Sequence, residues 1–222
     1  MRRLKKGKKP QILVDNEVLW TKEYCDCLNS GNKPCAEIAT RYNDETIKSA
    51  LEEETYGKCA YCESKMKHIS YADIEHILPK NKNARPDLYV SWSNLTLACE
   101  QCNRSGKRTY YDPNLPLINP YVDAPEQHFI DMGPIIMPIA GDDRAYVTKE
   151  ILKLNRGALV ERRQERIMSV EKLLNCWVME KQPTMKSVLE EQLHNEYAAD
   201  KEYSSTIKSY LFGVGFPVKD NL

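Results

Sequence analysis

Four cysteines stand at spacings that favour a structural zinc site. Cys59 and Cys62 form one CxxC pair, Cys99 and Cys102 form a second, and 36 residues separate the pairs. Each CxxC lets two thiolates turn toward one point, and two pairs supply the tetrahedral four-sulfur shell that structural zinc prefers. A closed thiolate shell leaves no position open for a substrate. The pattern therefore predicts a zinc ion that stabilises the fold and does no chemistry. The alternative is four unrelated buried cysteines.

The residues between the two pairs include side chains suited to phosphodiester hydrolysis. This reaction needs a base to deprotonate water, a cation to neutralise the phosphate and the leaving oxygen, and donors that hold the strand. His76 has an acid beside it and an Asn framework after it, which makes it the predicted general base, with a pKa near the working pH. The side-chain oxygens of Glu75 and Asn103 are hard ligands of the kind that bind Mg²⁺. The alternative for His76 is a histidine hydrogen-bonded within a small core.

The order of these residues resembles the HNH endonucleases, in particular the branch whose active unit is clasped by paired CxxC motifs. The shared order is CxxC, an acid–His pair with Pro three residues after the histidine, an Asn-Leu, and a CxxC followed by Asn and Gly-Lys. The resemblance implies that Asn94 pins the loop that orients the base and that Asn103 binds the catalytic metal. Glu75 stands where Asp is more frequent, so nearby Asp73 is a second candidate for that ligand.

Basic side chains near the motif are candidates for phosphate contacts, and they are Lys80, Arg104, Lys107 and Arg108. Such contacts position a nucleic acid without reading its sequence. The clustering of these side chains favours this interpretation over the alternative of a solvated surface. The other histidines are not expected to be catalytic: His68 lacks a matching partner, and His128 and His194 are expected to be structural or exposed.

The remaining cysteines form no complete metal-binding pattern. Cys25, Cys27 and Cys35 offer three thiols without an evident fourth ligand, and we expect ordinary cysteines there. Cys176 lies among apolar helix residues and is expected in the core. The start of the chain has no apolar leader segment, and no run approaches the roughly 18 apolar residues of a membrane span. We therefore expect a cytoplasmic protein, in which thiols stay reduced.

The expected fold is α+β and mainly helical, and the resemblance implies a zinc-clamped ββα-metal unit at its centre. One strand should end at His76, a loop should carry Asn94, and a helix near the second CxxC pair should present Asn103. Residues 1–55 are expected to form a basic arm and short helices, with Asn43-Asp44-Glu45 as a helix start signal, and residues 56–111 to form the nuclease core. The six prolines of residues 112–142 predict an extended wrapping segment without regular elements.

Residues 143–222 have the pattern of amphipathic helices. One apolar stripe has spacings of 7, 3, 4 and 3 residues and consists of Val160, Ile167, Val170, Leu174 and Trp177. Pro183 interrupts the helical pattern, and Val188, Gln192 and Tyr197 then share a face. A last helix is expected around Ile207 to Phe212. The stripe is expected to be core, and the region as a whole is a candidate for binding a partner.

The net charge of zero conceals an uneven distribution. The chain has 32 basic and 32 acidic side chains, which argues against a uniformly basic nucleic-acid binder. Residues 1–10 carry a charge of +6, residues 56–110 carry +4, and the remaining residues carry −10. A basic arm and core can bind phosphate while an acidic remainder faces a partner protein. The alternative for the arm is a solvated, frayed end.

Beyond the core, most of the chain resembles the HNH component of Septu and retron-associated antiphage systems. This wider resemblance implies an endonuclease that cuts DNA and acts with an ABC-type ATPase. For the retron members it also implies a reverse transcriptase with its non-coding RNA as partner, and RNA, in particular tRNA, as an alternative substrate. The residues alone allow a competing function, a zinc-stabilised nucleic-acid-binding module without catalysis. The joint presence of Glu75, His76 and Asn103 counts against that module.

Overall fold

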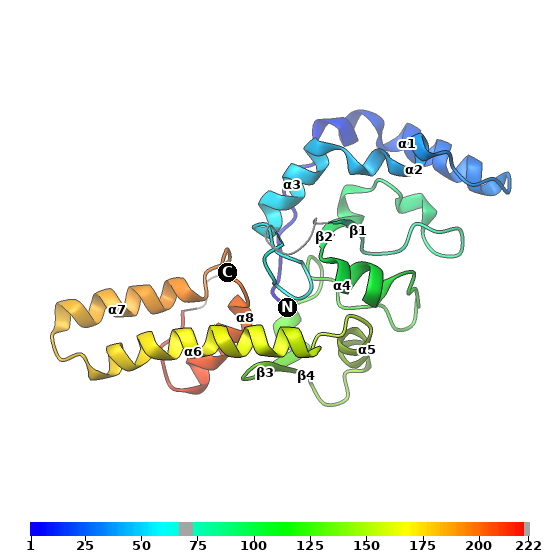
Figure 1. The fold of residues 1–222 in the computed structure, drawn as a ribbon. Coiled ribbons are helices and arrows are strands. Elements are labelled where there is room, and N and C mark those ends of the chain that lie inside the picture. The colour runs from blue at the N-terminus through cyan, green and yellow to red at the C-terminus, as the bar shows by residue number, and fades with distance from the viewer. Residues whose placement is uncertain (67–72, 220–222) are drawn as a thin grey trace.

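The structure is a computed structural model that describes residues 1–66 and 73–219. Figure 1 shows the arrangement of its elements. The helices are α1 (Gln11–Asn29), α2 (Ala36–Thr40), α3 (Glu45–Thr55), α4 (Glu100–Cys102), α5 (Asp143–Ile151), α6 (Gly157–Met179), α7 (Pro183–Glu196) and α8 (Ser204–Gly213). The strands are β1 (Asp73–His76), β2 (Leu95–Ala98), β3 (Phe129–Met132) and β4 (Ile135–Pro138). The prediction of a mainly helical α+β fold is confirmed. In the described part of the chain, every helix is too short or too polar to cross a membrane.

A strand–strand–helix unit begins between the two CxxC pairs and ends just after the second pair, as predicted. Strands β1 and β2 pair antiparallel, with Asp73 opposite Ala98 and His76 opposite Leu95. All four residues of β2 are buried. Helix α4 begins after Cys99 and continues directly into a π-helical turn (Asn103–Lys107). We refer to residues 73–107 as the ββα unit.

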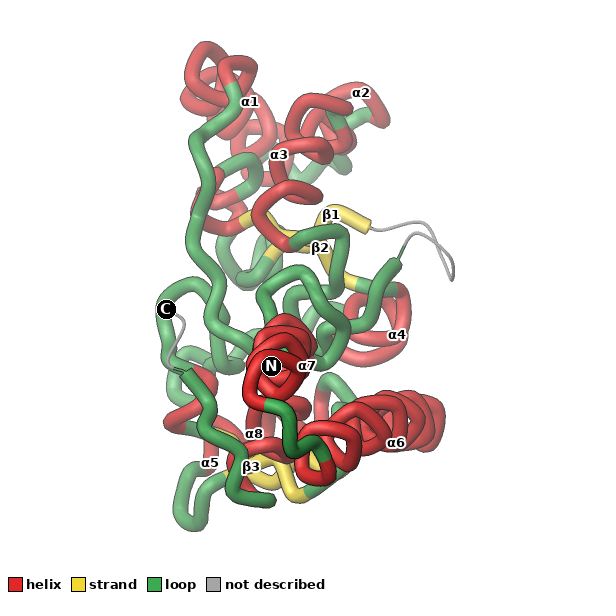
Figure 2. The backbone as a smooth tube through the Cα atoms, turned by 90° about the vertical axis from the view of Figure 1, so that its left-hand side faces the viewer, coloured by secondary structure: helices red, strands yellow, loops and turns green. Residues whose placement is uncertain are grey.

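Helices α1 to α3 cover one side of the β1–β2 pair, as Figures 1 and 2 both show. The predicted start signal of α3 is confirmed, because the Asp44 side chain accepts a hydrogen bond from the Thr46 backbone N–H at 2.8 Å. Ile47 and Leu51 are fully buried on the inner face of α3, which packs against β2. Helix α1 is longer than the short helices predicted, with 19 residues, because neither Pro nor Gly interrupts that stretch.

The Pro-rich segment contains an antiparallel hairpin of β3 and β4 that the sequence analysis missed. Gly133 has a φ of +60° and provides the turn, a conformation that residues with a Cβ rarely adopt. Pro134 lies in the turn and Pro138 is the last residue of β4, so neither proline interrupts the strand pairing. Phe129 and Ile136 are buried in the main core. The prediction of a segment without regular elements is therefore wrong at this hairpin.

The three predicted C-terminal helices are confirmed as α6, α7 and α8, with α5 as a further helix before them, and the α6–α7 hairpin projects from the rest of the molecule in Figure 1. Three residues of the predicted α6 stripe, Ile167, Val170 and Leu174, are buried in a second core with residues of α7 and α8. Cys176 is exposed, so its prediction as a core residue is wrong. The inner face of α7 also differs from the prediction, because it is formed by the residues Leu193 and His194 while Val188 is 44% exposed.

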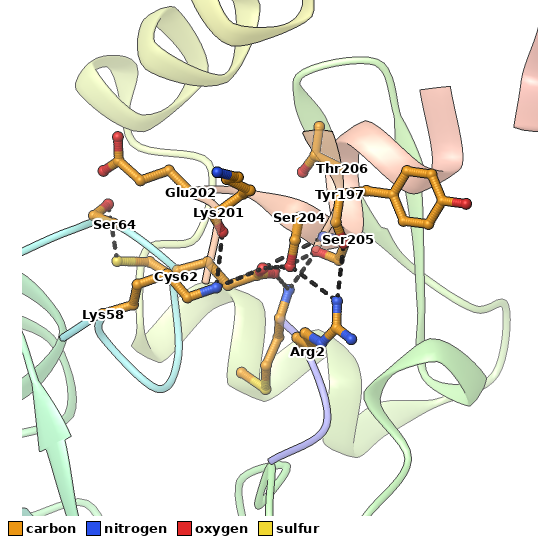
Figure 3. A network of polar contacts seen from close by, with 12 residues as sticks. Arg2, Lys58, Cys62, Ser64, Tyr197, Lys201, Glu202, Ser204, Ser205 and Thr206 are labelled. Atoms are coloured by element: carbon orange, nitrogen blue, oxygen red, sulfur yellow. Dashed lines mark hydrogen bonds and ion pairs between the residues drawn. The ribbon is translucent and has the colours of Figure 1, made fainter. Parts of the chain in front are cut away.

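The basic N-terminal arm (residues 1–10) is neither a frayed end nor a free cationic tail. Arg2 donates to the Tyr197 carbonyl oxygen at 3.1 Å (Figure 3), and Lys6 donates to Glu54 at 2.8 Å and to the Leu95 carbonyl oxygen at 2.6 Å. The arm therefore extends from the C-terminal helices to the ββα unit and on to α1, as the tube in Figure 2 shows. Two of its cationic side chains are thus half-buried and bound by groups of the protein itself.

A buried polar network around Glu63 joins the first CxxC pair to the C-terminal region. The Met1 ammonium lies 3.1 Å from Glu63 Oε1, and Ser204 Oγ donates to Glu63 Oε2 at 2.9 Å. Lys58 donates to the Lys201 carbonyl oxygen at 2.8 Å, a contact drawn in Figure 3. Burial opposes ionisation of Glu63, but the neighbouring cations and hydroxyls hold the pKa of this carboxyl below its ordinary value. The network thus holds a buried and paired carboxylate, that of Glu63, next in sequence to Cys62.

Candidate active site and metal centre

The four predicted cysteines meet at one point. The Sγ atoms of Cys59, Cys62, Cys99 and Cys102 all lie within 4.8 Å of one another, and those of Cys62 and Cys99 are 3.8 Å apart. Sulfur ligands 2.3 Å from a tetrahedral zinc ion lie about 3.8 Å apart, so the cluster is consistent with a zinc site. Three of these cysteines are buried and Cys99 is half-buried. Among the described residues, this cluster is the one group of three or more His, Cys, Asp and Glu side chains whose ligand atoms meet closely enough to hold a metal ion.

His76 ends β1 and is nearly enclosed, with 7% of its surface exposed. Its Nε2 lies 2.7 Å from the backbone carbonyl oxygen of Tyr89. A carbonyl oxygen only accepts, so Nε2 carries the ring proton and Nδ1 is the unprotonated nitrogen. Burial lowers the pKa of His76 to about 3, and the positive charges of Lys80 and Lys107 add to this shift. The expectation of a pKa near the working pH is therefore wrong for the free protein, and the ring is neutral at pH 7.

Asn94 bridges the two sides of the loop that follows His76. Its side-chain Oδ1 accepts from the Leu78 N–H at 2.8 Å, and its Nδ2 donates to the carbonyl oxygens of Leu78 at 2.9 Å and Leu88 at 3.2 Å. Its own carbonyl oxygen accepts from the Ile77 N–H at 2.8 Å. Asn94 is 3% exposed, so these bonds form away from water. The contacts are those that a loop-pinning residue needs, and the functional role remains a prediction.

Glu75 is buried beside a buried lysine. Lys107 Nζ lies 2.5 Å from Glu75 Oε1 and donates to the His76 carbonyl oxygen at 2.7 Å. Burial raises the pKa of Glu75, and the Lys107 ammonium opposes that shift. Apart from the Lys107 ammonium, Glu75 Oε1 has no hydrogen-bond donor among the described residues. A carboxylate oxygen is a hard ligand that can bind a divalent ion through a lone pair that the ammonium does not use.

The other two candidate ligands are placed differently. Asn103 is half-buried and begins the π-helical turn that also carries Lys107, so it belongs to the element that meets Glu75. Asp73 is bound by Arg104, whose Nε and Nη2 lie 2.8 Å from its two carboxylate oxygens. This bidentate pair neutralises Asp73. Glu75 and Asp73 are thus each paired with a cation, and which of them joins Asn103 as a metal ligand stays a prediction.

The predicted phosphate contacts fall into two groups. Arg104 and Arg108 are exposed, although Arg104 also holds Asp73. Lys80 is half-buried, its Nζ lies 3.7 Å from the centre of the Tyr42 ring, and burial lowers its pKa to about 8. Lys107 is 3% exposed and is engaged by Glu75, so it is placed as an internal cation and not as a surface contact.

Tyr42 lies against the candidate base and was missed by the sequence analysis. Its ring meets that of His76 edge to face, with centroids 4.7 Å apart and an interplanar angle of 81°. The residue comes from a 3₁₀ turn (Arg41–Asn43) between α2 and α3. Nothing in the sequence distinguishes it from the other 12 of the 13 tyrosines, because its position depends on how the N-terminal helices pack. The N-terminal region outside the motif thus lines one side of the site with the Tyr42 ring.

A cleft of about 290 Å³ lies next to this region and is lined by Ile77, Leu78, Arg144 and residues of the 110–123 segment. Arg144 is paired there with Asp123 at 2.8 Å. The lining is otherwise largely apolar and proline-rich, so the cleft lacks the free cations that a nucleic-acid strand needs. The cleft lies between the Pro-rich segment and the ββα unit.

The other described histidines and cysteines lie outside the candidate site. His128 Nδ1 is 2.5 Å from Asp142, and His194 is buried against the hydroxyl of Tyr197, so both are structural as predicted. His68 lies outside the described residues. The thiols of Cys25 and Cys27 are half-buried and that of Cys35 is exposed.

Comparison with known proteins identifies relatives for both the unit and the whole chain. Residues 59–108 match the HNH endonuclease family. A Septu protein PtuB from Bacillus thuringiensis is 33% identical over 224 residues, covering 94% of this chain and 81% of that protein. A Septu protein PtuA from Bacillus mycoides (strain KBAB4) is 29% identical over 177 residues, covering 66% of this chain and 24% of that protein. A protein from Vibrio cholerae serotype O1 biovar El Tor is named as an HNH endonuclease of retron Vc95. It is 30% identical over 118 residues, covering 49% of this chain and 57% of that protein. No solved structure matches the chain significantly.

Proposed function

Because the chain belongs to the PtuB family of Septu HNH endonucleases, we propose that it hydrolyses DNA with a divalent metal ion and His76 as general base. The observation that carries the proposal is the setting of His76, whose protonated Nε2 is fixed by the Tyr89 carbonyl oxygen. This contact leaves Nδ1 of a neutral ring as the acceptor. Asn94 holds the loop that carries that carbonyl group, through its bond to Leu88. The base is therefore oriented before substrate binds.

In this function Nδ1 of His76 takes a proton from the attacking water as its oxygen bonds to phosphorus. The P–O bond to the leaving group breaks, and the departing oxygen takes a proton from solvent. A pKa of about 3 makes His76 a weak base in the free protein. An anionic phosphate beside the ring favours the imidazolium form, so substrate binding raises this pKa and strengthens the base where it is needed.

Glu75 and Asn103 would hold the catalytic divalent ion, with Mg²⁺ as the expected cofactor. When bound, this ion neutralises charge on the phosphate and on the leaving oxygen. Arg104 and Arg108 are the exposed cations that would bind the phosphates of the strand. Cys59, Cys62, Cys99 and Cys102 would hold a structural zinc ion, whose closed sulfur shell keeps it out of the reaction.

A His76→Ala variant tests the mechanism. The variant should keep its zinc and its helical circular dichroism but lose nicking of supercoiled plasmid in Mg²⁺. His128→Ala is the matched control, because His128 is paired with Asp142 outside the site and its loss should leave cleavage unchanged. Cleavage by His76→Ala at the rate of the unaltered protein would remove His76 from the mechanism.

The substrate class needs its own experiment, because a relative of this chain carries the name of a retron. Purified protein is incubated with plasmid DNA and with total tRNA in parallel, both with Mg²⁺. We expect cleavage of DNA. Cleavage of tRNA alone would replace the DNA assignment with the RNA alternative and leave the hydrolytic chemistry intact.

We further propose that the chain acts in antiphage defence with a PtuA-like ATPase. The support is that a segment similar to this chain lies within a protein named PtuA. The candidate docking surface is the outer part of the α6–α7 hairpin, where exposed apolar side chains include Val178, Met179 and Met185. A Met179→Glu variant should lose co-purification with a co-expressed PtuA-like ATPase while retaining its zinc. Retained co-purification would exclude this surface.

A further inference from the structure

Arg156 lies over the cysteine cluster although it belongs to the C-terminal region. Its Nη1 donates to Cys102 Sγ at 3.7 Å, and its Nη2 donates to Cys62 Sγ at 3.7 Å and to Cys99 Sγ at 3.8 Å. One guanidinium thus contacts three of the four sulfurs. Arg156 directly precedes α6 and lies outside the residues 59–108 that match the HNH family.

The charge of the cluster explains why a guanidinium is suited to this position. Four thiolates around Zn²⁺ leave a net charge of −2, and burying that charge is costly unless a cation or hydrogen-bond donors accompany it. Among the described residues, Arg156 is the one cationic side chain that donates to these sulfurs. The Ser64 hydroxyl, 3.3 Å from Cys62 Sγ, is a neutral contact. Arg156 therefore halves the buried charge and its planar fork reaches several sulfurs at once.

The turn that carries Arg156 is packed closely on the second cysteine pair. A Cβ atom added to Gly106 would lie 2.9 Å from the carbonyl oxygen of Ile151, at the end of α5, so the two backbones approach each other directly. Leu152 and Leu154 are fully buried in the same core as Cys59 and Cys102. The turn between α5 and α6 is thus seated on the metal centre by both packing and charge.

We propose that Arg156 is an outer-sphere residue of the zinc centre, which retains the metal and fastens the α5–α6 turn to the ββα unit. The proposal rests on the zinc assignment made above and extends it to a residue outside the nuclease motif. The zinc ion then has a second structural role besides joining the two CxxC pairs. It holds the C-terminal helices against the candidate active site through the charge that Arg156 recognises.

The experiment compares zinc retention by the full-length Arg156→Met and Arg156→Lys variants. Zinc transfer to a colorimetric chelator should report an affinity about 10- to 100-fold weaker for Arg156→Met, the usual range for losing an outer-sphere partner. Arg156→Lys keeps the positive charge but loses the planar guanidinium group that reaches several sulfurs. Its zinc affinity should lie between those of Arg156→Met and the unaltered protein. Arg162→Met is the matched control, because Arg162 is an exposed residue of α6, the helix that follows Arg156, and is paired with Glu165. Its zinc affinity should not change.

Hydrogen exchange of residues 151–160 provides the second readout. Exchange should rise when zinc is chelated from the unaltered protein, and it should already be raised in zinc-loaded Arg156→Met. Unaltered zinc affinity and exchange in both variants would overturn the proposal, and if Arg156→Met does not fold, Arg156→Lys alone decides it. Metal analysis of the unaltered protein separates the outcomes, because a protein purified without zinc removes the zinc assignment itself. Nuclease assays on the unaltered protein test the proposed function separately from the zinc measurements and from the exchange measurements.

Discussion

Lys107 Nζ lies 2.5 Å from Glu75 Oε1 and also donates to the carbonyl oxygen of His76. The two acceptors are consecutive residues at the end of β1, and the lysine comes from the π-helical turn after α4. One ammonium group therefore joins the strand to the helix and balances a buried carboxylate. A divalent ion that binds Glu75 approaches a carboxylate that already has an internal counter-charge.

Replacing Lys107 by Met should destabilise the protein by about 3–5 kcal/mol, because it leaves the buried Glu75 without its counter-charge. Adding Glu75→Gln should recover most of that loss, since the pair is then removed together. The measurement is urea unfolding without added divalent ion. Lys82→Met, at an exposed position, is the control. Equal stability of the Lys107→Met protein and the control would show that the ion pair does not form.

The pKa of His76 predicts a pH dependence of stability. The folded pKa of about 3 is below the unfolded value of 6.5, so the stability contributed by the neutral ring is fully present above pH 6.5. As the pH falls from 6.5 toward 3, the unfolded chain binds a proton that the folded protein does not. Stability should fall by about 1.4 kcal/mol per pH unit from this group. His76→Asn should lack this component, which unfolding curves at several pH values can measure; parallel curves for the two proteins would contradict the shift.

Asn94→Ala should destabilise the loop that orients His76. The change leaves the backbone groups of Leu78 and the carbonyl oxygen of Leu88 without their buried partner, at a cost of about 1–3 kcal/mol. Nuclease activity should fall more than stability alone explains, because the Tyr89 carbonyl is carried by the same loop. Asn94→Asp keeps the oxygen that accepts from Leu78 N–H but loses both donated hydrogen bonds. Comparing its nuclease activity with that of Asn94→Ala therefore shows how much the accepted bond contributes. Full activity of Asn94→Ala would remove the pinning role.

Gly106→Ala tests the contact between the π-helical turn and α5. Its Cβ would lie 2.8 Å from the Gln101 carbonyl oxygen and 2.9 Å from that of Ile151, and both are backbone atoms that cannot move aside alone. We expect a loss of about 1–3 kcal/mol by overpacking. Gly157→Ala has no atom within 4 Å of the new methyl group and should be neutral or slightly stabilising. Thermal unfolding of both variants compares the sites, and a neutral Gly106→Ala would mean that the turn is not held against α5.

The parts of the site that were predictable are those encoded by local spacing. The two CxxC pairs come together as expected, and the strand ends at His76 with the helix after Cys99, because these features depend on short stretches of chain. The placement of Lys107 was not predictable in this way. A lysine after glycine in such a motif suits a phosphate contact equally well, and only the packing of the turn against β1 directs its ammonium inward.

The contributions from distant segments were also beyond the sequence analysis. Tyr42 and Arg156 reach the site and the metal centre from outside the motif, through helix packing that no local pattern specifies. The β3–β4 hairpin was hidden because its prolines lie where strand pairing does not need an N–H donor. Cys176 was misplaced because apolar neighbours along a helix do not determine which way a single side chain faces.

The N-terminal arm has a consequence for the order in which the protein is completed during synthesis. Arg2 is synthesised 195 residues before its acceptor Tyr197, whereas the Lys6 partners Glu54 and Leu95 emerge much earlier than Tyr197. Contacts of such sequence separation close late and slowly. The arm therefore docks in two stages, first along the nuclease unit and then onto the C-terminal helices. A nascent chain that carries the HNH motif can therefore complete the docking of its arm only after Tyr197 has emerged.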